Sequence, residues 1–275
     1  MQKIVADENK KYYKEQAELF QLQKEWRSNT ISELREETQI LHRDVQASEE
    51  RIILLRKQHH QDLKRLRHGF LQLSTQEQRK EDIQSFDDLD QYYRESDEDF
   101  VRLAKQVKPM IVTGKHIAIL GSTSRGKSTM INSLLGKHVA QVGIGEVTTE
   151  FEPYQGFDFI LWDTPGINDE TKFSSESIAL WKSMKHRLIL IESTIKENSK
   201  IMKRFDQIDL HYDIIVNKFD LADEEDQAQF REQIRSEVKS LGLKQLHSLF
   251  FLSAKYPGRY PDWINLVDYL TSSVS

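Results

Sequence analysis

The sequence predicts an α/β fold with a mainly parallel sheet, preceded by an all-α helical arm, and three observations support this expectation. Ten of the eleven glycines and all five prolines lie after residue 105, so the first part of the chain nearly lacks turn-forming residues. That part carries apolar residues at heptad-like spacing. The remainder alternates short apolar runs with amphipathic segments. We therefore expect a helical or coiled-coil region over residues 1–105 and a second domain over residues 106–275.

Composition excludes several classes of protein. The 39 Lys and Arg against 44 Asp and Glu give a net charge of −5, which argues against a nucleic-acid partner. Without cysteine there is no disulfide framework, zinc-thiolate site or cysteine nucleophile. No apolar run reaches the roughly 18 residues of a membrane span, and the first residues do not resemble a signal peptide. We expect a soluble protein of a reducing compartment, the cytoplasm.

The arm is rich in good helix formers, and its apolar residues form a seam. Spacings of four and three alternate along Leu34, Thr38, Leu41, Val45, Ser48, Ile52, Leu55 and His59; after a slip of one residue the seam resumes at Leu63, Leu66, Phe70 and Leu73. This spacing identifies a buried helix face but not its partner. A hairpin within the chain and a coiled-coil homodimer fit equally well.

Charge is segregated along the arm, with basic residues concentrated within 51–67 and acidic residues within 81–99. The two stretches could dock, but solvated helix faces explain them more simply. The basic stretch could also contact anionic lipid, although its apolar residues are explained as well by the seam. We therefore assign no ligand to either stretch.

The second domain reads as strands alternating with helices, as in a parallel sheet. Buried strands are expected over residues 116–120, 157–162, 188–191, 212–216 and 249–252, and helices over residues 127–135, 175–185, 196–205, 224–241 and 261–271.

A glycine-rich loop follows the first of these strands and opens a helix. Residues 121–128 fit the pattern G-x-x-x-x-G-K-S/T, which needs this strand–loop–helix context. Glycines let backbone NH groups wrap around phosphates at the helix N-terminus. Lys127 would supply a positive charge to the β- and γ-phosphates, and the hydroxyl of Ser128 would bind Mg²⁺. The loop therefore predicts a triphosphate site.

Two further segments fit such a site. Residues 163–166, Asp-Thr-Pro-Gly, follow the second apolar strand, so that Asp163 would lie beside the magnesium shell and the NH of Gly166 could sense the γ-phosphate. Residues 143–150 form a glycine-bearing loop with Thr148 and Thr149 before a short strand. This loop is a candidate switch, in which a threonine hydroxyl would close on Mg²⁺ when the γ-phosphate is present.

The next two motifs turn a triphosphate site into a guanine site. Asp220, in Asn-Lys-Phe-Asp, would accept hydrogen bonds from the ring NH and exocyclic amine of guanine, whereas adenine would leave it unpaired. The stem of Lys218 would lie along the base, and Asn217 would brace the loop. The backbone NH of Ala254, in Ser-Ala-Lys, would donate to the guanine keto oxygen. Each motif stands at a strand's carboxyl end, where parallel sheets place ligands.

Together these residues resemble the P-loop GTPase family over about residues 110–272. The resemblance implies a three-layer α/β G domain with a six-stranded sheet that binds GTP or GDP with Mg²⁺. The nucleotide-binding residues that it implies are Gly121, Ser122, Thr123, Ser124, Arg125, Gly126, Lys127, Ser128, Thr129, Asp163, Gly166, Asn217, Lys218, Asp220, Ser253, Ala254 and Lys255, with Ser128, Thr148 and Asp163 as metal ligands.

More narrowly, the loop sequence, the Ile-Asn-Ser-Leu-Leu that follows it and the Gly-Ile-Gly of the switch loop look like mitofusins and the dynamin superfamily. Matching on that Gly-Ile-Gly favours Thr148 over Thr149 as the switch threonine. The finer resemblance implies that GTP hydrolysis is activated when two G domains, or a G domain and a partner, meet.

GTP hydrolysis requires that the attacking water be positioned. Ile167 occupies the position where Ras-related GTPases carry a water-orienting glutamine, so water must be positioned by other means. The resemblance points to Lys127, Ser124 and Thr148 as catalytic residues. Arg125 would serve as an arginine finger or, more simply, be a solvated side chain. We expect a GTP-hydrolysing switch whose helical arm reads out the nucleotide state; the alternative is a coiled-coil scaffold that binds GTP without cycling.

Overall fold

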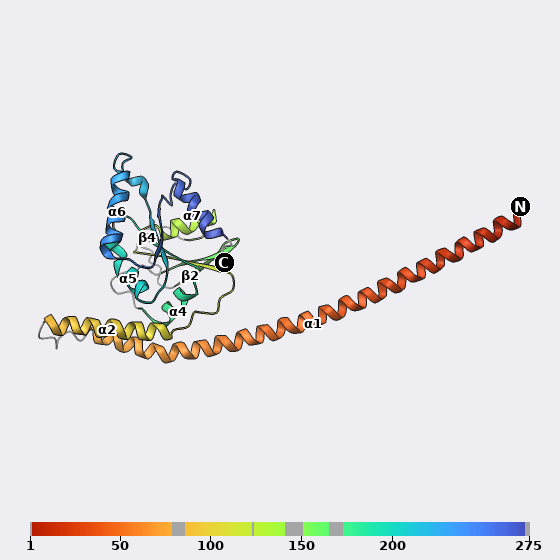
Figure 1. Ribbon diagram of the computed structural model, residues 1–275, viewed down its shortest axis with the longest axis horizontal. Helices are drawn as coiled ribbons and strands as arrows, with labels where there is room; N and C mark the ends of the chain where they lie inside the picture. The colour runs from red at the N-terminus through yellow and green to blue at the C-terminus, as the bar shows by residue number, and fades with distance from the viewer. Residues whose placement is uncertain (1, 79–85, 123, 141–150, 165–172, 273–275) are drawn as a thin grey trace. The chain divides into compact units, whose positions relative to one another are not determined.

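A computed structural model describes residues 2–78, 86–122, 124–140, 151–164 and 173–272 (Figure 1). The chain divides into two compact units, residues 1–57 and residues 58–275. The expected boundary after residue 105 therefore falls inside the second unit. Among the described residues, none of the helices has the length and apolarity that crossing a membrane requires.

The arm contains one uninterrupted helix, α1 (Gln2–Gln78), followed by α2 (Phe86–Gln106). Long helices were expected from the composition. In the first unit the seam side chains face solvent, and Leu34, Leu41 and Val45 are each more than half exposed. This part of the seam therefore has no partner among the described residues of the chain.

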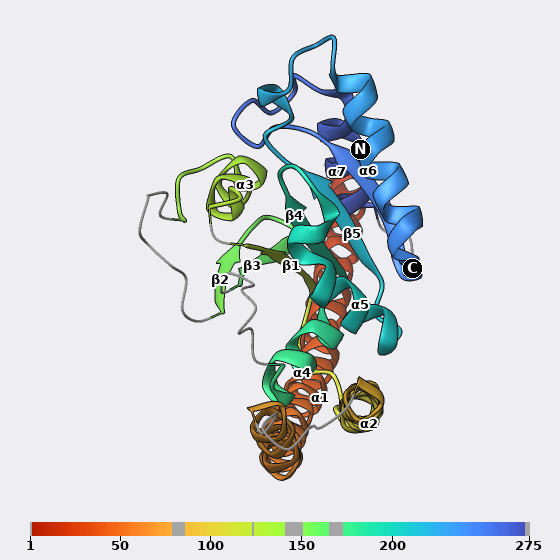
Figure 2. The ribbon, with the colours of Figure 1, turned by 90° about the vertical axis from the view of Figure 1, so that its left-hand side faces the viewer.

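In the second unit, the end of α1 and α2 form a helical hairpin (Figure 2). The rings of Phe70 and Phe100 meet edge to face, with centroids 6.3 Å apart. A Cβ atom at Gly69 would lie 3.1 Å from Leu103, so glycine is what allows the two helices to approach this closely. The hairpin interpretation thus holds for the seam residues from Leu63 onward.

The second unit is built on a six-stranded sheet with strand order β2-β3-β1-β4-β5-β6. The strands are β1 (Lys115–Gly121), β2 (Glu152–Gln155), β3 (Phe159–Asp163), β4 (His186–Ile191), β5 (Tyr212–Val216) and β6 (Leu246–Phe251). Only β2 is antiparallel to its neighbour, and the other pairings are parallel. The six strands and their direction agree with the fold class that the sequence predicts.

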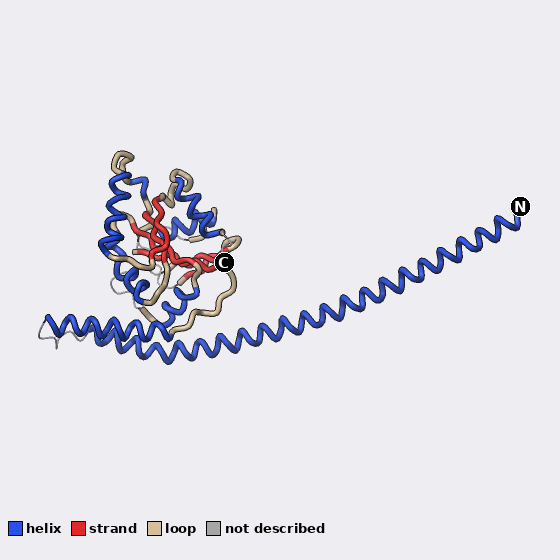
Figure 3. The backbone as a smooth tube through the Cα atoms, viewed as in Figure 1, coloured by secondary structure: helices blue, strands red, loops and turns tan. Residues whose placement is uncertain are grey.

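Helices cover both faces of this sheet (Figure 3). They are α3 (Lys127–Leu135), α4 (Ser175–Ser183), α5 (Ser199–Gln207), α6 (Gln227–Leu241) and α7 (Pro261–Thr271), with short 3-10 helices η2 (Ile195–Asn198) and η3 (Phe219–Leu221). Alternate residues of a strand point to opposite faces, so β1 sends Ile117 and Ile119 to one core and Ala118 and Leu120 to the other. The first core is closed by α3 and α7, and the second by α4, α5 and α6.

The helical hairpin packs on the outer side of the α4 layer. Leu63, Phe70, Phe100 and Ala104 belong to the same buried cluster as Trp181 of α4. The hairpin is therefore part of the second unit's hydrophobic core rather than an appendage to it.

Candidate nucleotide-binding site

Four of the predicted motifs meet at one edge of the sheet. The glycine-rich loop follows β1, Asp163 ends β3, Asn217 follows β5, and Ser253 follows β6 by two residues. Because these strands are parallel and neighbour one another through β4, their carboxyl ends share one edge. The fold thus gathers residues that are far apart in the sequence, from Gly121 to Ser253.

Two glycines of the loop are required by close backbone approach. Gly121 has φ +145°, and a Cβ atom there would lie 2.7 Å from the carbonyl oxygen of Leu190. Gly126 has φ +89°, and its Cβ would lie 2.5 Å from the side-chain nitrogen of Asn217. Since Gly126 caps the N-terminus of α3, it turns the chain from loop to helix at the point where backbone NH groups would face a phosphate.

Lys127 lies in the first turn of α3 and points back into the loop. It is buried, and its Nζ donates to the carbonyl oxygen of Gly121 at 3.2 Å. Burial lowers the pKa of Lys127, and the negative charge of Asp163 partly opposes this shift. The lysine is therefore a buried positive group in the loop, and a bound phosphate would compensate its desolvation.

Ser128 and Asp163 face each other across the site. The Ser128 hydroxyl donates to Oδ2 of Asp163 at 3.4 Å, and the Asp163 carboxyl group is buried. A hydroxyl oxygen and a carboxylate are the hard oxygen ligands that Mg²⁺ prefers. The two residues thus fit the predicted magnesium site, whose third predicted ligand, Thr148, lies outside the described residues.

Asn217 joins its own loop after β5 to the glycine-rich loop after β1 and to the Ser-Ala-Lys segment after β6. Its Nδ2 donates to the carbonyl oxygen of Arg125 at 2.8 Å, and its Oδ1 accepts from the backbone NH of Ala254 at 2.9 Å. Asn217 therefore braces the loop as expected. The NH of Ala254, expected to donate to guanine, here donates to Asn217, so guanine would have to take over or share that bond.

Lys218 and Arg125 are linked through a carboxylate that the sequence analysis did not single out. Nζ of Lys218 donates to the carbonyl oxygen of Ser124 at 3.1 Å and to Oε2 of Glu192 at 3.0 Å. Arg125 approaches the same Glu192 oxygen at 2.7 Å and Glu197 at 2.9 Å. Arg125 is thus paired with two carboxylates, and its interpretation as a solvated side chain is wrong.

The electrostatics of Glu192 reflect these partners. Burial alone would raise its pKa, but hydrogen bonds from Lys218 and Arg125 and their positive charges outweigh burial and lower the pKa. No motif marks Glu192 or Glu197 in the sequence. The available signal was positional, since Glu192 directly follows β4 at the edge where the other motifs lie.

The remaining predicted residues are placed around these contacts. Asp220 lies partly exposed in η3, Ser253 is buried and accepts from the NH of Tyr256 at 3.3 Å, and Lys255 is exposed.

Ser124 is exposed with φ 65°, an uncommon conformation for a residue with a side chain. Ser122 donates to the Asn198 side chain at 3.3 Å, and Thr129 lies in α3. Thr123, Thr148, Gly166 and Ile167 lie outside the described residues.

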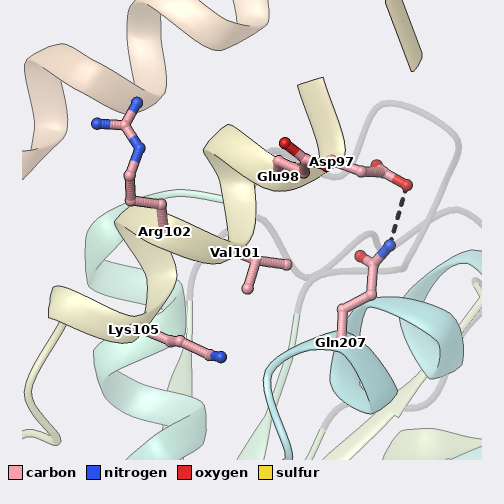
Figure 4. Close-up of a pocket in the computed structure, with 6 residues that line it drawn as sticks. All are labelled: Asp97, Glu98, Val101, Arg102, Lys105 and Gln207. Atoms are coloured by element: carbon pink, nitrogen blue, oxygen red, sulfur yellow. Dashed lines mark hydrogen bonds between the residues drawn. The ribbon is translucent and has the colours of Figure 1, made fainter. Parts of the chain in front are cut away.

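A hollow of about 530 Å³ lies elsewhere, between α2 and α5 (Figure 4). It is lined by Asp97, Glu98, Val101, Arg102, Lys105 and Gln207. Nε2 of Gln207 donates to Oδ2 of Asp97 at 2.9 Å. None of the predicted nucleotide-binding residues lines it, so it is a feature of the hairpin–domain junction.

Comparisons with known proteins agree with the site. A family model described as 50S ribosome-binding GTPase matches residues 116–245. The chain is similar to the GTPase Der of Desulfitobacterium hafniense, with 29% identity over 178 residues that cover 58% of this chain and 40% of the relative. It is similar to the GTPase Era of Ehrlichia canis, with 33% identity over 117 residues that cover 38% of this chain and 40% of the relative.

A solved structure of Era from Aquifex aeolicus bound to GDP·AlF4− aligns at 18% identity with a TM-score of 0.44, covering 58% of this chain and 57% of that one. The chain spans about 40% of the length of the curated relatives named above. Because those relatives are Der and Era proteins, the finer resemblance to mitofusins and the dynamin superfamily stays a prediction.

Proposed function

We propose that this chain binds GTP and GDP with Mg²⁺ and hydrolyses GTP to GDP and phosphate, since a family model described as 50S ribosome-binding GTPase matches residues 116–245. The observation that carries the proposal is the convergence of Lys127, Asp163 and Asn217 on one edge of the sheet, each held by a contact that its role requires. The match covers only 40% of the Der relative, so the proposal extends to this chain none of that protein's other properties.

Each of these residues has a distinct part in nucleotide binding. Lys127 and the loop NH groups would hold the β- and γ-phosphates at the N-terminus of α3. Ser128 and Asp163 would hold Mg²⁺, which when bound neutralises charge that develops on the phosphates. Asp220 would select guanine, and Lys218, anchored on Ser124 and Glu192, would lie along the base.

For the hydrolysis step, we assign Ser124 a catalytic role in the loop. Its side chain is exposed and its backbone is left-handed, while its carbonyl oxygen accepts a hydrogen bond from Lys218. Arg125 would have to leave Glu192 and Glu197 before it could stabilise charge on the transferring phosphoryl group. An activating contact that competes for these carboxylates would therefore release the arginine.

Nucleotide binding is tested by the substitution Lys127→Ala. We expect the affinity for a fluorescent GTP analogue to fall at least about tenfold, because the buried positive charge that faces the phosphates is removed. Lys137→Ala, a surface lysine just beyond α3, is the matched control and should bind as the unmodified chain does. Unchanged binding by the Lys127 variant would refute the proposed site.

We propose that turnover is activated by G-domain association or by a partner. If G-domain association is the activator, the specific activity for GTP should rise with protein concentration, and a non-hydrolysable GTP analogue should cause association beyond that seen in GDP. Flat, slow turnover by a monomer would point instead to a separate activating partner. Phosphate release indistinguishable from buffer at high concentration would favour the alternative of a non-cycling GTP-binding scaffold.

We also propose that the helical hairpin reads out the nucleotide state. The segment after Asp163 leads into α4, whose first residue, Ser175, donates to the carbonyl oxygen of Leu63 in α1 at 3.2 Å. Lys182 of α4 donates to the carbonyl oxygens of Ala104 and Val107 at 2.7 and 2.8 Å. A shift of α4 driven by the γ-phosphate would therefore move the last turn of α2.

Hydrogen exchange tests this coupling. Amides of residues 96–107 should exchange differently in GDP and in a non-hydrolysable GTP analogue, whereas those of α7, on the opposite face of the sheet, should not. Ser175→Ala and Lys182→Met should reduce the difference without changing GTP affinity. Identical exchange of the hairpin in both nucleotides would exclude the readout.

The description of the matched family names the large ribosomal subunit, and this raises the question of an RNA partner. With a net charge of −5, we propose that the chain does not bind nucleic acid. Co-sedimentation with ribosomal subunits, repeated at two salt concentrations, tests this expectation. A chain that sediments with the subunits would contradict it.

A further inference from the structure

The first unit presents an apolar face that nothing in the described chain covers. Along residues 31–55 of α1, Ile31, Leu34, Leu41, Val45 and Leu55 are 42–58% exposed. These residues follow the heptad spacing, with Ile31 extending the seam toward the N-terminus by three residues. A seam of this kind is stable only when a second helix covers it.

Heptad positions can be assigned to this segment. Positions a are Ile31, Thr38, Val45 and Ile52, and positions d are Leu34, Leu41, Ser48 and Leu55. Flanking them are Arg35, His42, Glu49 and Arg56 at positions e, and Glu37, Asp44 and Arg51 at positions g. The assignment allows both possible orientations of a second copy to be compared.

We propose that residues 31–55 pair with the same residues of a second copy in an antiparallel coiled coil centred on Arg43. In this register positions a face positions d of the other copy. The layers are Ile31 with Leu55, Leu34 with Ile52, Leu41 with Val45, and Thr38 with Ser48. Apolar residues meet apolar ones, and the two polar seam residues meet each other.

The polar layer can be buried because its hydroxyls are already satisfied. Oγ1 of Thr38 donates to the carbonyl oxygen of Leu34 at 2.6 Å, and Oγ of Ser48 donates to that of Asp44 at 2.8 Å. Each bond lies within one helix, four residues apart. Pairing would therefore leave no hydroxyl donor unsatisfied in the seam.

Charge on the flanks selects the antiparallel orientation. It brings Arg35 to Glu49 and Glu37 to Arg51, each pair occurring twice by symmetry, against a single Asp44–Asp44 contact at the centre. A parallel, in-register pair would instead place Asp44 by Glu49 and Arg51 by Arg56, also twice each. Opposite charges thus outnumber like charges only in the antiparallel pair. The chains that follow Lys57 then leave the paired segment at opposite ends.

The existence of the dimer is tested on the full chain by sedimentation equilibrium in GDP, where association of G domains is not expected. Leu41→Glu and Val45→Glu, which place charges in the seam, should each weaken the dimer at least about tenfold. Ile40→Glu and Leu54→Glu are matched controls, since these residues are 51% and 56% exposed but lie at position c. A monomeric unmodified chain, or equal weakening by seam and control variants, would overturn the proposal.

Orientation is tested by reversing charge. Glu49→Arg and Arg51→Glu each create like-charge pairs in the antiparallel dimer, so both should weaken it. In a parallel dimer, the same substitutions replace like-charge pairs by opposite ones and should strengthen it. The double substitution of Arg35 to Glu and Glu49 to Arg should restore antiparallel pairing, and strengthening by the single variants would overturn the orientation.

The absence of cysteine allows a second, independent test. Chains carrying Leu34→Cys mixed with chains carrying Ile52→Cys should form disulfide-linked pairs on mild oxidation, whereas chains carrying Leu34→Cys alone should not. Linkage of the Leu34→Cys chains to one another would show a parallel pair. Both tests leave GTP binding untouched, so they fail or succeed independently of the nucleotide site.

Discussion

Glu192 links two segments of the proposed nucleotide site. One of its carboxylate oxygens accepts from Arg125 of the phosphate-binding loop and from Lys218 of the base-binding loop. Asn217 makes a second tie between the same segments through backbone groups. Because these two links already hold the segments in place, less of the binding free energy would be spent on ordering them when a nucleotide binds.

Glu192→Gln should therefore weaken GDP binding by about tenfold, equivalent to about 1.4 kcal/mol. The amide keeps the shape but removes the charge that holds both cations, so the loops lose preorganisation. The dissociation rate of a fluorescent GDP measures the effect. Glu224→Gln, whose side chain is 88% exposed, is the control and should leave the rate unchanged. Equal rates for both variants would show that Glu192 does not position the site.

The lowered pKa of Glu192 also predicts a pH dependence of stability. Its ordinary value is 4.5, and the folded value lies below this, so the folded protein binds fewer protons than the unfolded chain. The stabilisation is complete above about pH 4.5 and is lost as the pH falls through the folded pKa. The difference in melting temperature between the unmodified chain and Glu192→Gln should be constant from about pH 5 to 7 and shrink below. A difference that grows toward low pH would contradict this assignment.

Among the structural elements, the hairpin of α1 and α2 owes its position to aromatic packing. Phe100 is 5% exposed, and its ring meets Phe173 edge to face, with centroids 5.5 Å apart. The guanidinium of Arg204 in α5 lies over the same ring at 4.2 Å, and it also pairs with Asp97 at 2.6 Å. Phe100 thus joins the hairpin to the residues just before α4 and to α5.

Replacing Phe100 with alanine should lower the free energy of unfolding by about 3–5 kcal/mol, the usual cost of removing a buried ring. Urea denaturation measures the loss. Phe157→Ala provides a matched control, because Phe157 is 99% exposed and the same truncation there removes no buried contact. Similar midpoints for both variants would mean that the hairpin is not part of the cooperative core.

Some features of the helices could be predicted from the sequence and others could not. The bounds of α3 and α7 were predicted to the residue, because a glycine-lysine turn begins one helix and a proline begins the other. The seam of the arm was predicted, but not that its first part is exposed while its second part is buried. The slip between His59 and Leu63 lies close to the start of the second unit, and residues from Leu63 onward pack on α2 and α4. Heptad spacing defines a face, and only the folded chain shows what covers it.

At the scale of the whole molecule, the division after Lys57 predicts two separable activities. A chain beginning at Gln58 should fold and bind GTP with unchanged affinity, because its core and its nucleotide site lie within residues 58–275. The same chain should be monomeric in GDP, since it lacks residues 31–55. Circular dichroism, nucleotide titration and sedimentation of the shortened chain check these expectations. Loss of GTP binding would show that the two units are interdependent.

That the motifs of the candidate site lie together could be predicted from the sequence, because each follows a strand and a parallel sheet brings the carboxyl ends of its strands to one edge. The partners of Arg125, Glu192 and Glu197, could not be predicted from the sequence. They lie 67 and 72 positions further along the chain, and ion pairs at such separations follow no local pattern. The interpretation of Arg125 as solvated failed for the same reason: exposure was inferred from charge alone. Long-range pairing is a property of the fold, so it becomes visible only with the fold.

The donors of the site have a consequence for how nucleotide leaves it. Lys127 donates to Gly121, Ser128 to Asp163, and the NH of Ala254 to Asn217, so each already has an internal acceptor. Departure of GDP would exchange one set of hydrogen bonds for another, without stranding these polar groups. Binding at this site is therefore an exchange of hydrogen-bond acceptors, in which the protein's own oxygens and those of the nucleotide serve the same donors in turn.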